Sequence, residues 1–367
     1  MTMILDGSLG VTFNDASLQP AAASPYGLKN KIINGDMRVD QRNAGASVSA
    51  TTSSWSVDRW QAYASQTSKY TIQQSSTVPS GFNTSVLVTS SSAYSVTSTD
   101  IFFLRQIIEG YNIADLGFGT AGAKTFTLSF WVRSSLTGTF GGSLTNDSNR
   151  AYPFTYTISS ANTWEQKTIT LTADTSGTWG STNTAGLAVI FSLGAGSTRE
   201  GTAGAWTGTN YYGATGETSV VGTNGATFYI TGVQLEIGTS ATPFERRLYG
   251  QELANCQRYY YKLIGDTAGD FFATGYNQGT ANAYYCMPYP VTMRTSPSAL
   301  EQTGTASDYS IASAVGNVIC NAVPVFDGST ANSLRFSFYV ASGLTAGQGS
   351  GARSNAVTSY LAVSAEL

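Results

Sequence analysis

The chain has 367 residues, a length that favours two domains, and its net charge of -3 provides no basic field to hold nucleic acid. Only 11% of its residues are charged, against about 25% in an average globular domain. With 39 glycines and 21 tyrosines, the composition is typical of a β-rich surface on which hydroxyl groups replace charges.

Histidine is absent from the sequence, which excludes Ser-His-Asp and Cys-His catalysis and His-ligated zinc. Three cysteines, Cys256, Cys286 and Cys320, leave at least one thiol unpaired and favour a reducing cytoplasm over a disulfide framework. The first residues, MTMILDGSLG, lack the basic and apolar regions of a signal peptide, and no apolar run reaches membrane-spanning length. We therefore expect cytoplasmic synthesis and no membrane insertion.

Residues 1–29 form a small unit that is too short to bury a core of its own. Its apolar residues therefore need a partner surface: Ile4, Leu5, Leu9, Val11 and Phe13. One interpretation is a frayed strand on the following domain, and the other is an attachment or trimerisation segment. The stretch GSLGVTFNDASLQPAAA is similar to the short G-x-x-F-x-D-G-T-x-Q-x-x-A segments common in bacteriophage tail-fibre and collar proteins, with Ala16 where a glycine is usual.

Residues 30–247 read as a series of short strands separated by Gly, Ser, Asn and Thr clusters. The clearest strand is TFTLSFWVR, in which Phe126, Leu128, Phe130 and Val132 alternate with Thr127, Ser129, Trp131 and Arg133. Similar patterns cover 69–74, 85–89, 101–109, 166–172 and 186–194. Such spacing is typical of antiparallel hairpins, so we predict an antiparallel sandwich. A long Gly/Thr-rich stretch between Gly194 and Gly225 interrupts the series, and ordered loops of this length are uncommon unless they are functional.

The segment from Phe228 to Lys262 contains the last strand of this domain and the passage to the next. Regular alternation would bury Val233, Leu235 and Ile237, whereas a bulge at Gly232 would bring Phe228 and Ile230 onto the same face, and both registers stay open. Residues 248–262 are predicted to be a hinge with one short helix. Residues 263–367 contain five or more short strands and are predicted to form a second, smaller β-sandwich.

Several motifs together resemble one family. The opening LKNKIINGDMRVDQRNAG, the SVDRW, the strand TFTLSFWVRSS and the closing TGVQLEIGTSATPFERRLYGQELANCQRYYYK resemble bacteriophage structural proteins known as tail fibres, many from cyanobacterial and marine phages. The resemblance covers about two thirds of the chain, residues 28–262. It implies a jelly roll of the carbohydrate-binding-module type over residues 30–247, with a C-terminal part that varies between members.

A sugar site needs exposed aromatic rings and polar side chains, because a pyranose has an apolar face and a polar edge. Six residues are candidates for glycan binding: Trp131 and Arg133 on the outward phase of a strand, and Trp179, Trp206, Tyr211 and Tyr212 in Gly-rich loops. The alternative is that a loop or a neighbouring subunit covers these rings.

Charged residues suggest two further sites. Asp36, Asp40 and Glu236 could be ligands of a structural calcium, although no calcium-loop spacing is present and Arg pairing explains them as well. Near the hinge, Glu245, Arg246 and Arg247 could form ion pairs between subunits or simply solvate a linker. No other cofactor is predicted, and no pair of carboxylates stands out as catalytic.

We expect a non-enzymatic homotrimeric fibre protein of a phage tail. Residues 1–29 would bind other virion tail proteins, and residues 263–367 would be the tip that meets a glycan or protein receptor on the host surface. One alternative is a capsid-decorating or tail-assembly protein without a receptor role. The other is a polysaccharide depolymerase.

Overall fold

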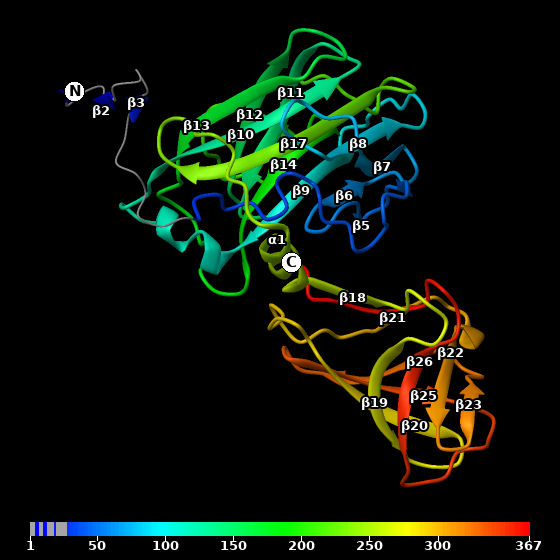
Figure 1. Ribbon diagram of the computed structural model, residues 1–367. Coiled ribbons are helices and arrows are strands. Elements are labelled where there is room, and N and C mark those ends of the chain that lie inside the picture. The colour runs from blue at the N-terminus through cyan, green and yellow to red at the C-terminus, as the bar shows by residue number, and fades with distance from the viewer. Residues whose placement is uncertain (1–3, 7–9, 13–17, 20–27) are drawn as a thin grey trace.

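The computed structural model describes residues 4–6, 10–12, 18–19 and 28–367. Two antiparallel six-stranded sheets pack face to face and form the first domain (Figure 1). Sheet 1 has the order β13 (Glu165–Thr172), β10 (Thr125–Ser134), β17 (Thr227–Ile237), β8 (Ser85–Ser90), β7 (Tyr70–Ser75) and β4 (Val48–Ser49). Sheet 2 has the order β12 (Ala151–Ile158), β11 (Gly138–Thr145), β14 (Ala185–Ala195), β9 (Ile101–Glu109), β6 (Gln61–Ala64) and β5 (Ser54–Trp55). The predicted antiparallel jelly-roll sandwich is confirmed.

Strand β10 shows why the period-2 pattern located the core. It lies between β13 and β17, and its four alternating apolar residues are fully buried: Phe126, Leu128, Phe130 and Val132. Because successive side chains point to opposite faces of a sheet, Trp131 and Arg133 are on the outward side. The predicted strand and its buried face are both confirmed.

The register of β17 is settled by a bulge at Gly232. This glycine has a φ of 61°, and the pairing with β10 shifts between Ser129 and Trp131. The extra residue changes the phase, so Ile230 and Val233 both reach the core while Ile237 stays 42% exposed. A side chain at position 232 would meet the ring of Phe82 at 2.6 Å from its Cβ, which explains the glycine.

The C-terminal domain is the predicted second, smaller β-sandwich. Its larger sheet, sheet 3, has the order β23 (Gly316–Ile319), β22 (Tyr309–Ser313), β26 (Gly349–Ser354), β19 (Phe271–Asn277), β20 (Asn282–Pro288), β25 (Ser333–Tyr339) and β24 (Val325–Ser329). A smaller sheet contains β18 (Tyr260–Ile264), β27 (Tyr360–Ser364) and β21 (Glu301–Gln302). Leu361 and Val363 of β27 share one core with Phe336 and Phe338 of sheet 3.

The N-terminal segment contains three short strands, β1 (Ile4–Asp6), β2 (Gly10–Thr12) and β3 (Leu18–Gln19), which pair antiparallel. Of the five apolar residues predicted to contact other subunits, Ile4, Leu5 and Val11 belong to β1 and β2, whereas Leu9 and Phe13 lie outside the described residues. Attachment and trimerisation through this segment stay predictions.

The predicted hinge consists of a packed helix followed by the start of β18. Helix α1 (Tyr249–Gln257) buries Glu252 and Cys256, and Tyr259 after it is fully buried. The helix in this segment was therefore predicted correctly. Across the residues that the structure describes, no helix is long and apolar enough to cross a membrane.

The two domains meet at a seam rich in arginines. The C-terminal end of the chain returns to this seam beside α1, between the domains (Figure 1). There the Glu366 carboxylate accepts hydrogen bonds from Arg42, at 3.2 Å, and from Arg59. The side chains of Arg59 and Glu366 are 1% and 6% exposed. Removing one member of such a buried pair would leave the other charge unpaired and desolvated.

Two more arginines from the C-terminal side complete the seam. Arg294 donates to the carbonyl oxygens of Ala365 and Glu366, both at 2.7 Å, and to that of Asn183 in the first domain at 2.8 Å. Arg258 donates to the buried Glu109 carboxylate at 2.5 and 2.9 Å. Burial alone would raise the pKa of Glu109, but the hydrogen bonds from Arg258 and Tyr259 lower it below its usual value.

Candidate functional site

The outward face of sheet 2 is covered by the chain itself. Tyr212, from the long Gly/Thr-rich stretch, stacks on Phe103 with ring centroids 5.5 Å apart and planes 6° apart. Tyr63 stacks on the same Phe103 at 5.1 Å. Leu367 packs on this cluster as well, and the outward-facing Ile190 is fully buried. The apolar cluster around Phe103 on this face is therefore covered by the chain itself.

A carboxylate fastens the covering stretch, which also forms the parallel pair β15 (Glu200–Gly201) and β16 (Gly213–Ala214). Glu217 accepts hydrogen bonds from the Ser192 hydroxyl of β14 and, at 2.9 Å, from the Ala214 N–H. A Cβ on Gly141 would lie 1.8 Å from this carboxylate, so the glycine makes room for it. Burial raises the pKa of Glu217 to about 7.

Trp179 and Trp206, two of the six predicted glycan-binding residues, pack on each other and on Phe118. The rings of Trp179 and Phe118 stack at 4.2 Å, and Trp206 meets Trp179 edge-on at 5.4 Å. Each indole N–H donates to a backbone carbonyl at 2.9 Å, Trp179 to Ser176 and Trp206 to Thr172. Neighbouring aromatic rings and carbonyls thus occupy much of the surface of both indoles.

The other predicted glycan-binding residues lie in two separate places. Trp131 and Arg133 are on the outward face of sheet 1, where the Arg133 guanidinium lies over the Tyr229 ring at 4.8 Å. Tyr211 and Tyr212 belong to the stretch that covers sheet 2, and a Cβ on Gly201 would be 2.3 Å from the Tyr211 ring. The structure therefore does not gather the six residues into one site.

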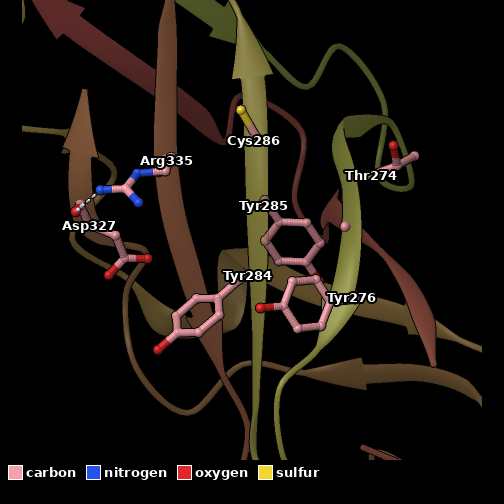
Figure 2. Close-up of a pocket in the computed structure, with 8 residues that line it drawn as sticks. Thr274, Tyr276, Tyr284, Tyr285, Cys286, Asp327 and Arg335 are labelled. Carbon is pink, nitrogen blue, oxygen red and sulfur yellow. Dashed lines mark hydrogen bonds between the residues drawn. The ribbon is translucent and has the colours of Figure 1, made fainter. Parts of the chain in front are cut away.

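An open site lies instead on the outward face of sheet 3, in the C-terminal domain. A depression of about 610 Å³ is lined by residues of four adjacent strands. We call it the tyrosine face, and it consists of Thr274, Gly275, Tyr276, Tyr284, Tyr285, Cys286, Asp327 and Arg335 (Figure 2). Of these side chains, Tyr276 is 52% exposed, which makes its ring available to a ligand.

Strand register positions the tyrosine face. Tyr276 of β19 pairs directly with Tyr284 of β20, and their rings meet edge-on at 6.2 Å. On the next strand, Arg335 of β25 pairs with Cys286 of β20. Figure 2 shows the two tyrosines together, with Arg335 and Asp327 on the far side of Tyr284. Hydrophobic ring surface and charged groups thus follow one another across the sheet.

A bulge in the edge strand places the charged end. The pairing of β24 with β25 shifts between Phe326 and Gly328, and Gly328 has a φ of 140°. A Cβ there would lie 2.9 Å from the nearest guanidinium nitrogen of Arg335, so glycine lets this side chain lie along β24. Arg335 donates to the Asp327 carbonyl at 3.4 Å, and the Asp327 carboxylate accepts from Ser337 at 3.2 Å.

The polar groups of the tyrosine face have hydrogen-bonding capacity to spare. Within the described part of the chain, neither Arg335 nor Asp327 forms an ion pair, and the Tyr276 and Tyr284 hydroxyls have no partner. Arg335 supplies donors, Asp327 supplies acceptors, and the tyrosines supply ring faces. This set can bind a molecule that has apolar faces and many hydroxyl groups.

Sequence reasoning missed every residue of the tyrosine face. They come from four strands between residues 274 and 335, so no local motif unites them. One signal was available: Tyr276 and Tyr284 are equally far from Thr280, in the turn sequence NQGTAN, and a hairpin centred there pairs them.

The predicted calcium ligands each have a protein partner, although Asp36 Oδ1 is buried without a hydrogen bond in the described part of the chain. Asp36 pairs with Arg38 at 3.2 Å, Asp40 accepts from the Asn43 and Gly45 N–H groups, and Glu236 accepts from Thr242. In the described ranges, no three His, Cys, Asp or Glu residues gather in a way that could hold a metal ion.

The charged residues predicted for subunit contacts find partners inside the chain. Arg247 pairs with Glu245 at 3.0 Å and with Glu252 at 3.2 Å, and its side chain is only 8% exposed. Arg246 lies over the Phe82 ring at 4.8 Å. These residues fasten the segment after β17 to the first domain.

No protein-family model matches the chain, and no curated protein does either. Similar solved structures include the enzymatically active domain of tailspike protein 4 of bacteriophage CBA120, with 16% identity, a TM-score of 0.29, and a match over 59% of this chain and 22% of that one. They also include TmCBM61 in complex with β-1,4-galactotriose, with 9% identity, a TM-score of 0.30, and a match over 57% of this chain and 100% of that one.

A third similar structure is the family 11 carbohydrate-binding module of Clostridium thermocellum in complex with a mixed-linked tetrasaccharide. It shares 11% identity with a TM-score of 0.27, over 55% of this chain and 100% of that one. The chain thus spans about a fifth of the tailspike domain's length and all of each binding module. Because the TM-scores are low, these likenesses carry no inference about a ligand.

Proposed function

We propose that this chain is a non-enzymatic attachment protein of tail-fibre type, which binds a glycan on the host surface through the tyrosine face. The observation that carries the proposal is the combination, on one exposed sheet face, of two tyrosine rings with an arginine and a carboxylate that lack ionic partners in the described chain. Sugars need this combination of ring surface and polar groups.

The rest of the chain fits such a protein. The motifs between residues 28 and 262 resemble phage tail fibres. The N-terminal segment resembles parts common in fibre and collar proteins, and it would join a homotrimer to other tail proteins. In this arrangement the jelly roll is the stalk, the C-terminal domain is the tip, and the protein belongs to the virion.

Binding to intact cells tests the proposal. The full chain, labelled at amino groups because Cys286 lines the site, is incubated with a panel of cyanobacterial strains before and after periodate oxidation of surface sugars. We expect saturable binding that periodate abolishes and that Tyr284→Ala weakens, whereas Tyr111→Ala, at a tyrosine that is 62% exposed elsewhere, leaves it intact. Binding that survives periodate, or that both variants weaken equally, would contradict glycan recognition at this face.

Assembly and activity are separate parts of the proposal. Light scattering of the full chain at micromolar concentration should give the mass of a trimer, and a monomer would remove the fibre arrangement. Incubation with purified envelope glycan should release no oligosaccharide. Release would show a depolymerase and overturn the non-enzymatic assignment.

A further inference from the structure

We propose that the tyrosine face binds an internal stretch of an uncharged, linear polysaccharide that lies across the strands. The proposal rests on the glycan-binding function proposed above and adds three properties: the direction of the ligand, its length and its charge. Each follows from a different observation.

The direction follows from the strand order. The lining residues come from β19, β20, β25 and β24, which are neighbours in that order, and they form one band across the sheet. The register pairs Tyr276 with Tyr284 and Cys286 with Arg335, which are contacts between strands. A ligand that touches both tyrosines and Asp327 must therefore cross the strands (Figure 2).

The length follows from the strand spacing. Four adjacent strands with about 4.8 Å between neighbours span about 14 Å. A sugar unit in an extended chain is about as long as one strand spacing, so the band accommodates roughly three units. The tyrosines would contact one end of this stretch, and Arg335 with Asp327 would bind hydroxyl groups of the other end, about two strand spacings away.

The charge follows from the composition of the face. Its two ionised side chains, Arg335 and Asp327, have opposite signs, and every other lining residue is uncharged. An anionic sugar would gain from Arg335 but would also approach Asp327. Uncharged hydroxyl groups can instead donate to Asp327 and accept from Arg335 in the same complex.

A length series on a carbohydrate array tests all three properties. The array carries linear glucans, mannans and galactans from the monosaccharide up to roughly six units, with oligogalacturonates as the charged series. The full chain should bind an uncharged series with an affinity that increases up to about three units and then stays level. Raising the salt concentration should leave this affinity nearly unchanged, because no ionic attraction is screened.

The direction of the ligand is tested by the oligosaccharide length at which each substitution begins to weaken binding. Tyr284→Ala should weaken binding of chains of every length, by roughly tenfold, as expected for loss of a main aromatic contact. Asp327→Asn should weaken only chains long enough to extend from the tyrosines to β24, and the exposed Asp266→Asn should affect none.

Four outcomes overturn the proposal. Binding of the charged series alone would contradict the charge, and a monosaccharide bound as tightly as longer chains would contradict the length. An equal effect of Asp327→Asn on short and long chains would contradict the direction. In these three cases glycan binding by the protein would still stand, whereas an absence of binding to the whole array and to cells would remove both proposals.

Discussion

The two domains treat the outward faces of their sheets in opposite ways. In the jelly roll, Phe103 on sheet 2 is covered by Tyr212, and only 1% of its surface is exposed. In the C-terminal domain, Tyr276 on sheet 3 is 52% exposed and lines a depression that is open in the described part of the chain. Both faces carry aromatic residues on short antiparallel strands. An outward aromatic residue is thus accessible to a ligand only where the chain does not stack a ring of its own over it.

The largest expected effect concerns the buried Arg59–Glu366 ion pair at the seam between the two domains. Glu366→Gln leaves the Arg59 guanidinium, which is 1% exposed, without its anionic partner. We expect this variant to lose about 3–5 kcal/mol of unfolding free energy, measured by urea denaturation. Glu165→Gln is the matched control, because the Glu165–Lys167 pair is more accessible, with side chains 17% and 18% exposed, and should cost at most about 1 kcal/mol. Equal losses in the two variants would show that the seam is not a buried ionic contact in solution.

A second prediction compares one tyrosine substitution on the covered face with one on the open face. Tyr212→Ala removes the ring stacked on Phe103 and should cost about 2–3 kcal/mol of stability while glycan binding is unchanged. Tyr284→Ala should do the reverse, with weaker binding and a stability change within about 0.5 kcal/mol. Thermal unfolding measures the stability of each variant, and the carbohydrate array measures its affinity for glycan. If Tyr212→Ala abolished binding of a folded protein, the covered face would have to be the site.

A third prediction uses pH to loosen the covering stretch. Burial raises the pKa of Glu217 from 4.5 in the unfolded chain to about 7, so between these pH values the folded state binds more protons. Stability should therefore decrease as pH rises from 4.5 to 7, by at most about 1.4 kcal/mol per pH unit from this group.

Denaturation of Glu217→Gln at several pH values isolates this contribution. Asp58, whose pKa burial raises to about 6, contributes with the same sign in both proteins and cancels in the difference. A pH profile that the substitution leaves unaltered would mean that Glu217 is solvated in solution.

The smallest expected effect is on the open face. Gly328→Ala places a Cβ 2.9 Å from the nearest guanidinium nitrogen of Arg335, so this side chain must leave β24. We expect a few-fold loss of affinity for long chains only, because a single misplaced hydrogen-bonding group costs on the order of 1 kcal/mol. Gly304→Ala, at another glycine with a positive φ of 84° and with open space around it, controls for backbone strain. Equal loss in the two variants would mean that Gly328 does not position Arg335.

The fold could be predicted well where the alternation was regular. TFTLSFWVR has one apolar phase, and its four core residues were assigned correctly because period 2 leaves no other register. At Gly232 the same reasoning had to keep two registers open. A bulge is decided by the pairing of β17 with β10 and by the space beside Phe82, neither of which is local in sequence.

The candidate site could not be predicted for a related reason. Trp179, Trp206 and Tyr212 occur in Gly-rich stretches, which usually signals exposure, but the stretches fold back and pack these rings on Phe118 and Phe103. Arg335 and Asp327 are ordinary in sequence, and they join Tyr284 only through the order of β20, β25 and β24. Exposure depends on which segment returns to cover a ring, and composition does not contain that information.

The chain enters the C-terminal domain through β18 and leaves it through β27, and these strands pair with each other along their whole length. A single connecting strand would permit swivelling, but this antiparallel ribbon, with its outgoing end fixed by Arg42, Arg59 and Arg294, resists torsion. The orientation of the tyrosine face is therefore fixed relative to the jelly roll of the same chain. If copies of the chain assemble as proposed, each tyrosine face keeps a fixed orientation relative to its own jelly roll, and a repeating polymer that reaches several faces would bind with avidity beyond that of one site.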